Sequence, residues 1–244
     1  MKYDVVIASD DWRYWAMWAG TLVGGTALLA GFRRIPEERK PAALQALGVT
    51  LLAANALNPL ASLFGSALEM SWHRSLPLHF CTLNFLLLAL NCFWRNERVF
   101  VYTAFLGIIG GVHAFITPQF PMGDSPVMVV DYALRHGAIV FVPLLMAREY
   151  GMRFPRRAWV WTYGMAALVS TIVGGVNWAI NTIDPQEVVA NYMYMWEAPK
   201  VDNPLVQAGW GWPLYLLPLH AALIVHLLLI EWLFKRARLH ESTS

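Results

Sequence analysis

Apolar residues along the chain form seven long runs separated by polar or proline-containing connections. A helix of about 20 apolar residues spans the hydrocarbon layer of a bilayer, so each run is a candidate membrane span. The runs are too long and too continuously apolar for the alternating strands of a membrane barrel, so helices are expected. The pattern therefore predicts one polytopic, all-α membrane domain over residues 1–244. The expected helices are 12–32, 42–67, 77–94, 99–116, 131–147, 158–180 and 213–234.

The fourth and fifth runs are marginal in length, which leaves a tilted or re-entrant path open for them. Composition agrees with the membrane class. Hydrophobic residues make up 57% of the chain and charged residues 14%, which is more apolar than a water-soluble core of this size can bury. The first run follows Asp10 and Asp11 instead of a basic stretch, so it is expected to stay in the mature protein as a span.

Basic residues gather on alternate connections, and this asymmetry predicts the orientation. The opposite side has little beyond Lys2, Arg13, Arg74 and Lys200. We therefore expect the C-terminus in the cytoplasm and the N-terminus outside. The net charge of +2 is too small to imply a nucleic-acid partner. The basic residues assigned to the cytoplasmic side are Arg33, Arg34, Arg39, Lys40, Arg95, Arg98, Arg148, Arg153, Arg156, Arg157, Lys235, Arg236 and Arg238.

Two outer connections, 117–130 and 181–212, are long enough to act as lids. The first contains three prolines, which favour an ordered, non-helical path. The second is rich in Tyr and Trp, which either contribute to a binding surface or are ordinary residues of the membrane interface.

One thiol and three imidazoles are expected at a common depth beneath the outer surface. Polar groups at such depths are costly against lipid and normally face the bundle interior or a wet cavity, so a polar pocket that opens outward is predicted. Asn84, Asn177, Asn181, Thr117 and Arg135 add polar groups nearby. At 1.5 Å of rise per residue, the expected depths are about 6 Å for Cys81, about 5 Å for His113, about 8 Å for His136 and about 10 Å for His220.

Two charged pairs have the i,i+4 spacing of helical ion pairs. Glu231 with Lys235 is expected to be a structural anchor near the cytoplasmic end. Asp131 with Arg135 is expected either to be structural or to anchor a substrate headgroup.

Neither cysteine belongs to a metal or redox motif. Cys81 and Cys92 would lie about 16 Å apart along one helix, which excludes a disulfide. Cys92 is expected to be a small buried hydrophobe. Close helix packing is predicted at two glycine pairs, Gly20 with Gly24 and Gly107 with Gly111.

A thiol becomes a nucleophile when a base lies within about 3 Å of it. His79 is two residues from Cys81, which on a regular helix places the two side chains about 200° apart unless the first turn is distorted. His136 or His113, from another helix at matched depth, is a better base, and His136 is favoured. Asn84 shares the face of Cys81 and could orient a partner or bind an oxyanion.

Two alternatives use the same residues. A non-enzymatic protein would bind or transport a small metabolite through Asp131, Arg135 and His220. A metal site would use His79, His113, His136 and Cys81, which suit Zn²⁺ or Cu but have no local spacing signature. The catalytic interpretation needs no cofactor and no metal.

Four segments resemble a known family of bacterial membrane proteins, the YwaF-like family. They are Leu76-Pro77-Leu78-His79-Phe80-Cys81, His113-Ala114-Phe115-Ile116-Thr117-Pro118, His136-Gly137 and Asn191-Tyr192-Met193-Tyr194. That family groups with animal membrane acyltransferases that form ether phospholipids, and these resemble, more distantly, intramembrane hydrolases of branched fatty-acid esters.

The resemblance implies that Cys81 is the nucleophile and His136 the general base, with His79 in the same signature and His113 nearby. It implies acyl transfer or ester hydrolysis on membrane phospholipids or other acyl lipids, in the bacterial plasma membrane. The residues expected to contact substrate are Asn84, Asp131, Arg135, Asn177, Asn191, Tyr192, Tyr194 and His220.

Overall fold

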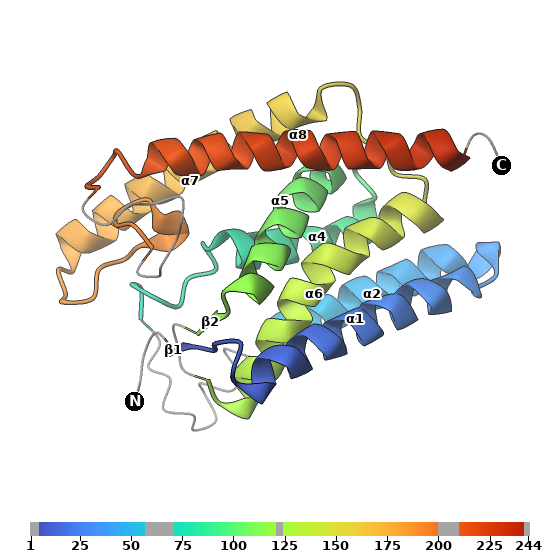
Figure 1. Ribbon diagram of the computed structural model, residues 1–244, viewed down its shortest axis with the longest axis horizontal. Helices are drawn as coiled ribbons and strands as arrows, with labels where there is room; N and C mark the ends of the chain where they lie inside the picture. Colours follow the sequence, from blue (N-terminus) through green and yellow to red (C-terminus); the bar gives the residue numbers. More distant parts are fainter. Residues whose placement is uncertain (1–4, 57–70, 121–123, 200–209, 242–244) are drawn as a thin grey trace. The chain divides into compact units, whose positions relative to one another are not determined.

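The computed structural model describes residues 5–56, 71–120, 124–199 and 210–241, with side chains up to residue 236. This part of the chain is nearly all-α, as predicted. Its helices are α1 (Trp12–Arg33), η1 (Glu37–Arg39), α2 (Lys40–Asn55), α4 (Phe80–Trp94), α5 (Glu97–Ile116), α6 (Pro126–Glu149), α7 (Ala158–Ile183), η2 (Tyr192–Tyr194) and α8 (Leu216–Glu241), and its strands are β1 (Val5–Val6) and β2 (Gln119–Phe120) (Figure 1).

A helix lies in each of the seven predicted runs. Within the described residues, five helices are long and apolar enough to cross a membrane, namely α1, α5, α6, α7 and α8. By contrast α4 has 15 residues, and the end of the second predicted run lies in 57–70, outside the described residues. The count of seven spans and the orientation of the termini therefore stay predictions.

The chain divides into two compact units. Unit 1 comprises Met1–Met70 with Phe80–Arg153, and unit 2 comprises Ser71–His79 with Phe154–Ser244. The prediction of one continuous domain stays a prediction.

In unit 1, α5 packs against both α4 and α6, while α2 packs against α4 and α1 packs against α6 (Figure 1). Every residue of α5 from Phe100 to Gly107 is buried. Eight consecutive residues cover the whole circumference of a helix, so α5 is enclosed by its neighbours over two turns.

Close approach to α5 depends on its glycines. A Cβ atom at Gly107 would lie 2.4 Å from the carbonyl oxygen of Ile139, and one at Gly111 would lie 2.4 Å from the Val140 side chain. The predicted packing role of this pair is therefore confirmed. The prediction for Gly20 and Gly24 is wrong, because a Cβ there would meet no atom of the described residues within 4 Å. Gly25 takes that role on α1, where it faces Phe141.

Helix boundaries follow local capping chemistry. Asp11 caps α1 by accepting from the Arg13 amide at 2.8 Å, and Asn96 caps α5 through the amide of Arg98. Pro126 begins α6, where its missing N–H costs nothing, so α6 starts five residues earlier than predicted and Asp131 lies inside it. Residues 76–79 form a turn, and α4 begins after it, three residues later than predicted.

A short sheet joins the start of the chain to the connection after α5. Val5 pairs with Phe120 in antiparallel register, and the amide of Ile7 donates to the carbonyl of Pro118 at 3.1 Å. No strand was predicted here, because two-residue strands are too short to show an alternating pattern.

Arg13 ties the same two segments together electrostatically. Its guanidinium donates to Asp11 at 2.6 Å and to Asp124 at 2.7 Å. Hydrogen bonds from Arg13 are the main reason why the pKa values of both carboxyl groups fall below the ordinary 3.8. All three side chains are partly exposed.

In unit 2, the Glu231 carboxylate joins α7 to α8. One of its oxygens accepts the backbone N–H of Trp159, in the first turn of α7, at 3.0 Å. The other oxygen pairs with Lys235, so the predicted Glu231–Lys235 pair is confirmed. The rings of Phe154 and Phe234 stack nearby with centroids 4.4 Å apart. Glu231 is thus also a remote cap for α7.

Replacing Gly107 with alanine should destabilise unit 1 by about 1–3 kcal/mol, because the added methyl group would collide with backbone and not with a flexible side chain. The thermal unfolding midpoint of the purified protein in detergent measures this effect. Gly20→Ala is the matched control and should leave the midpoint unchanged or slightly raised. Equal midpoints for the two variants would refute the claim that close packing against α5 requires a glycine at position 107.

Asp124→Asn should lower the unfolding midpoint at about pH 7, where the carboxylate is charged and paired with Arg13. A lowered pKa stabilises the folded state above the ordinary value of 3.8 and loses that contribution as the pH falls further. The difference from wild type should therefore shrink toward about pH 3. Asp10→Asn removes a charge nearby and serves as control; a pH-independent difference for Asp124→Asn would refute the ionic contribution.

Candidate functional site

Cys81 lies in the first turn of α4 as a half-buried free thiol. A Cβ atom at Gly110 would lie 3.2 Å from its sulfur, so the thiol rests against the bare backbone of α5. Among the described residues, the Cys81 thiol forms no hydrogen bond. The buried Cys92 thiol, in contrast, donates to the carbonyl of Leu88 at 3.4 Å.

His136 is buried in α6, and its ring has a defined orientation. Its Nδ1 lies 2.8 Å from the carbonyl oxygen of Tyr132, and the Tyr132 ring stacks on it at 4.0 Å between centroids. Since a carbonyl only accepts hydrogen bonds, Nδ1 carries the proton of the neutral imidazole. The other nitrogen, Nε2, then has a lone pair and is able to accept a proton.

The two residues contact consecutive positions of one helix. Cys81 touches Gly110 of α5, and a Cβ atom at Gly111 would lie 2.9 Å from the His136 carbonyl oxygen. The ring of Phe115, one turn further along α5, lies 6.3 Å from the His136 ring. The Cys81 thiol of α4 and the His136 backbone of α6 therefore pack against adjacent residues of α5.

Asn84 follows Cys81 by three residues and is buried against α5. Its Nδ2 donates to the Thr103 carbonyl at 3.3 Å. This bond uses one of the two amide hydrogens. Within the described residues its Oδ1 is buried without a hydrogen-bond partner.

His113 is exposed on the surface of α5 near its C-terminal end. Its backbone carbonyl accepts the amide of Thr117 at 3.1 Å, which ends the helix.

Asp131 and Arg135 form the buried i,i+4 pair that their spacing predicted. The Arg135 Nε donates to Asp131 at 2.7 Å, and a second nitrogen donates to the Asn55 side chain at 2.6 Å. The guanidinium also lies over the Phe85 ring, 5.2 Å from its centroid. These contacts link α6 to α2 and α4, which fits the structural alternative for this pair.

In unit 2, two amides of α7 hold the following segment by its backbone. Asn177 exchanges two hydrogen bonds with Tyr192, donating to its carbonyl at 2.9 Å and accepting its amide at 3.1 Å. Asn181 does the same with Ala190 at 3.1 and 2.7 Å. Their i,i+4 spacing places both amides on one face, so they pair with the segment as a neighbouring strand would.

Tyr192 is fully buried and connects this segment to residues 71–79. Its hydroxyl donates to the carbonyl of Trp72 at 2.8 Å and accepts the amide of Leu76 at 3.0 Å. Burial raises its pKa, so the phenol stays protonated and able to donate. The His79 ring meets the Tyr192 ring edge-on at 5.0 Å, and the buried His73 bonds the carbonyl of Asp184 at 2.8 Å.

The remaining predicted residues of unit 2 also make local contacts. The Asn191 side chain bonds three backbone groups of Trp196 and Glu197 at 3.0 Å each. The Tyr194 carbonyl accepts the Tyr215 hydroxyl at 2.7 Å. His220 of α8 lies 3.2 Å from the Tyr163 hydroxyl of α7.

The predicted site residues thus fall into two groups. Cys81, Asn84, His113, Asp131, Arg135 and His136 belong to unit 1, whereas His79, Asn177, Asn191, Tyr192, Tyr194 and His220 belong to unit 2. In the part of the chain that the structure describes, no group of three or more His, Cys, Asp or Glu residues could hold a metal ion.

A model of the TMEM164 family matches residues 8–231, which is most of the chain. The chain belongs to the TMEM164 family. This is a family of membrane proteins, in agreement with the five apolar helices described above. The TMEM164 match includes every candidate site residue from His79 to His220. No curated protein and no solved structure matches the chain.

Sequence reasoning missed three residues that organise these regions of the TMEM164 family member. Tyr132 orients His136, Asn55 binds Arg135, and His73 holds residues 71–79 to the end of α7. Tyr132 lies four residues before His136, so its contact with His136 could have been predicted from helical spacing. The contacts of Asn55 and His73 cross 80 and 111 residues of sequence, and no local pattern predicts them.

Asn177→Ala should loosen the segment after α7, because the buried amide and carbonyl of Tyr192 would both lose their partner at a cost of about 1–3 kcal/mol. Limited proteolysis should then cut residues 190–197 faster than in wild type. Thr182→Ala is the control, since the exposed Thr182 hydroxyl bonds only within α7 at Trp178 among the described residues. Unchanged cleavage in Asn177→Ala would refute the anchoring role.

Proposed function

We propose that this protein is an integral membrane enzyme that transfers or hydrolyses the acyl group of a membrane lipid, with Cys81 as nucleophile and His136 as general base. The observation that carries the proposal is the packing of the Cys81 sulfur on Gly110 and of the His136 backbone on Gly111, together with the defined tautomer of His136. The Nδ1 bond to Tyr132 leaves Nε2 as the basic nitrogen, which is what abstraction of a thiol proton requires.

The position of Cys81 in its helix also favours the reaction. The first turn of an α-helix has backbone N–H groups without intrahelical partners and is the positive end of the helix dipole. Cys81 is the second residue of α4. The oxyanion of a tetrahedral intermediate is stabilised by such N–H groups.

The proposed reaction has two steps. In the first, Nε2 of His136 accepts the thiol proton, the sulfur attacks the ester carbonyl carbon, and the carbon–oxygen bond breaks as the leaving alcohol takes that proton back. In the second, His136 accepts a proton from the hydroxyl of another lipid or from water, whose oxygen attacks the thioester carbonyl carbon. The carbon–sulfur bond breaks, and the Cys81 sulfur takes that proton from His136, which restores the thiol. The free Nδ2 hydrogen of Asn84 is the proposed donor to the oxyanion.

The remaining parts of the proposal concern the surroundings of this site. His113 is exposed at the end of α5, where a lipid headgroup would reach it. Within unit 2, His79 and Tyr192 are proposed to contact a lipid, and their ring contact at 5.0 Å holds the two side chains together. Seven spans, an outer N-terminus, a cytoplasmic C-terminus and the bacterial plasma membrane complete the proposal.

Covalent labelling tests it. The purified protein, incubated with a phospholipid that has an alkyne-tagged acyl chain, should acquire a label that hydroxylamine removes, as expected of a thioester. Cys81→Ala should abolish the label, and His136→Ala should slow its formation by about 10²–10⁴-fold. Analysis of the products distinguishes a released fatty acid from a second acylated lipid.

Matched controls are present in the same chain. Cys92→Ala removes the other thiol, and His226→Ala removes an imidazole whose Nδ1 bonds an i−4 carbonyl at 2.7 Å, as that of His136 does at 2.8 Å. Both variants should be labelled at the wild-type rate. Full labelling of Cys81→Ala would exclude the thiol as nucleophile, and an equal loss in both histidine variants would exclude a specific base.

A further inference from the structure

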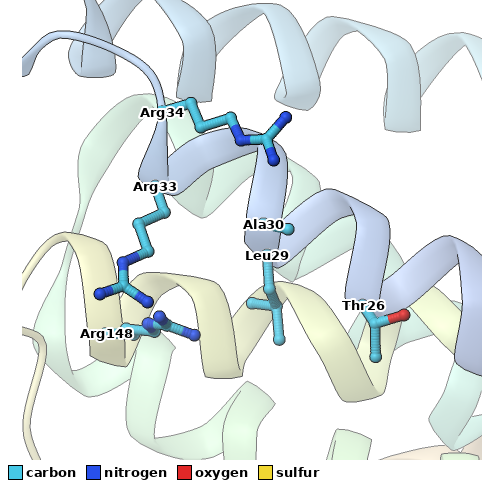
Figure 2. Close-up of a pocket in the computed structure, with 6 residues that line it drawn as sticks. All are labelled: Thr26, Leu29, Ala30, Arg33, Arg34 and Arg148. Carbon is cyan, nitrogen blue, oxygen red and sulfur yellow. The ribbon is translucent and has the colours of Figure 1, made fainter.

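Three arginines line one hollow in unit 1, beside the C-terminal ends of α1 and α6. The hollow has a volume of about 580 Å³, and its lining consists of Thr26, Leu29, Ala30, Arg33, Arg34 and Arg148. Figure 2 shows Arg33 reaching from α1 toward Arg148 on α6, whereas Arg34 extends in another direction. Arg148 lies 12 residues beyond His136 along α6, about 18 Å away, so this hollow is separate from the proposed catalytic site.

Positive charge in the hollow is only partly balanced. Among the described residues, Arg33 and Arg34 form no ion pair. Arg148 lies 3.3 Å from Glu149, whose other oxygen pairs with Lys40 at 2.8 Å, and Lys40 also pairs with Glu37 at 2.5 Å. The unbalanced positive charge of the hollow is therefore that of Arg33 and Arg34. Guanidinium groups that face each other repel, and a bound phosphate would relieve that repulsion with charge-assisted hydrogen bonds.

The other end of the hollow is apolar. Leu29 and Ala30 line it, and the Thr26 hydroxyl donates to the Leu22 carbonyl at 2.7 Å within α1. From Thr26 to Arg33 the axis of α1 rises about 10 Å. A cationic end and an apolar end at this separation suit an amphiphile, and inorganic phosphate would leave the apolar end unused.

Both helices are candidate membrane spans, and the basic ends of such spans are expected among the lipid headgroups. A general bias toward basic residues on one membrane side explains why arginines occur there. It does not explain why three of them, from two helices, surround one hollow with an apolar floor.

We propose that this hollow is a binding site for an anionic phospholipid, whose phosphate lies between Arg33 and Arg148 and one of whose acyl chains lies along Leu29 and Ala30. The site is independent of the acyl-transfer reaction proposed above, and its occupant is a resident lipid of the leaflet at that side.

Native mass spectrometry of the full chain in detergent tests the proposal, with dioleoyl phosphatidate as probe and dioleoyl phosphatidylcholine as its zwitterionic competitor. Wild type should retain phosphatidate in preference to phosphatidylcholine. The double variant Arg33→Gln/Arg148→Gln should weaken phosphatidate binding about tenfold or more, as loss of charge-assisted hydrogen bonds predicts. Arg98→Gln/Arg153→Gln removes two exposed arginines of unit 1 that do not line the hollow, and it should bind as wild type does.

Two further experiments distinguish binding of the whole lipid from binding of its headgroup alone. Ala30→Trp fills the apolar end without changing charge and should also weaken phosphatidate binding. Glycerol 3-phosphate should not displace the lipid at equal concentration. Equal loss in the two double variants, equal retention of phosphatidylcholine, or displacement by glycerol 3-phosphate would each overturn the proposal.

Discussion

The close approach of α4 and α6 to the bare backbone of α5 is the constraint on which unit 1 depends. Lipid tails are as apolar as Leu or Phe side chains, so apolar burial alone gives membrane helices little reason to associate. Van der Waals contact at short range then becomes the main attraction, and it requires positions without side chains. Gly107, Gly110 and Gly111 supply these positions on successive faces of α5.

The same glycines also fix the positions of the two residues proposed to be catalytic. Because Gly110 has no side chain, the Cys81 sulfur lies directly against the α5 backbone, and because Gly111 has none, the His136 backbone packs against the adjacent residue of α5. A larger side chain at Gly110 or Gly111 would therefore displace α4, which carries Cys81, or α6, which carries His136.

Unit 2 shows a different use of polarity. Long irregular segments near a membrane need partners for their backbone groups. The amides of Asn177, Asn181 and Asn191 supply them, so three conspicuous polar residues are explained by structure. Candidates for chemistry are better sought among polar groups with hydrogen-bonding capacity left over, which in unit 1 include the Cys81 thiol, Nε2 of His136 and the Asn84 amide.

The sequence predicted the helices well, because apolar runs are a strong signal, and α1 agrees with its predicted run to within one residue. Ion pairs at i,i+4 were also predictable, since both partners lie on one helix. The rotation of each helix about its axis was not predictable from the sequence, and the exposed His113 is an example. Contacts between distant segments, such as the pairing of Val5 with Phe120, were not predictable either, because no local sequence pattern indicates them. The closely packed glycines were predicted correctly on α5 but not on α1. On α1 the spacing pointed to Gly24, whereas the contact is made by Gly25.

Glu231 of α8 imposes a mechanical restriction on unit 2. Its carboxylate accepts the Trp159 amide of α7 while it is paired with Lys235 of its own helix. Sliding α8 along α7 by one turn, about 5.4 Å, would uncap α7 and leave that N–H without an acceptor. Loss of this hydrogen bond would cost about 1–3 kcal/mol, which opposes sliding of α8 along α7 and favours movement of the two helices together.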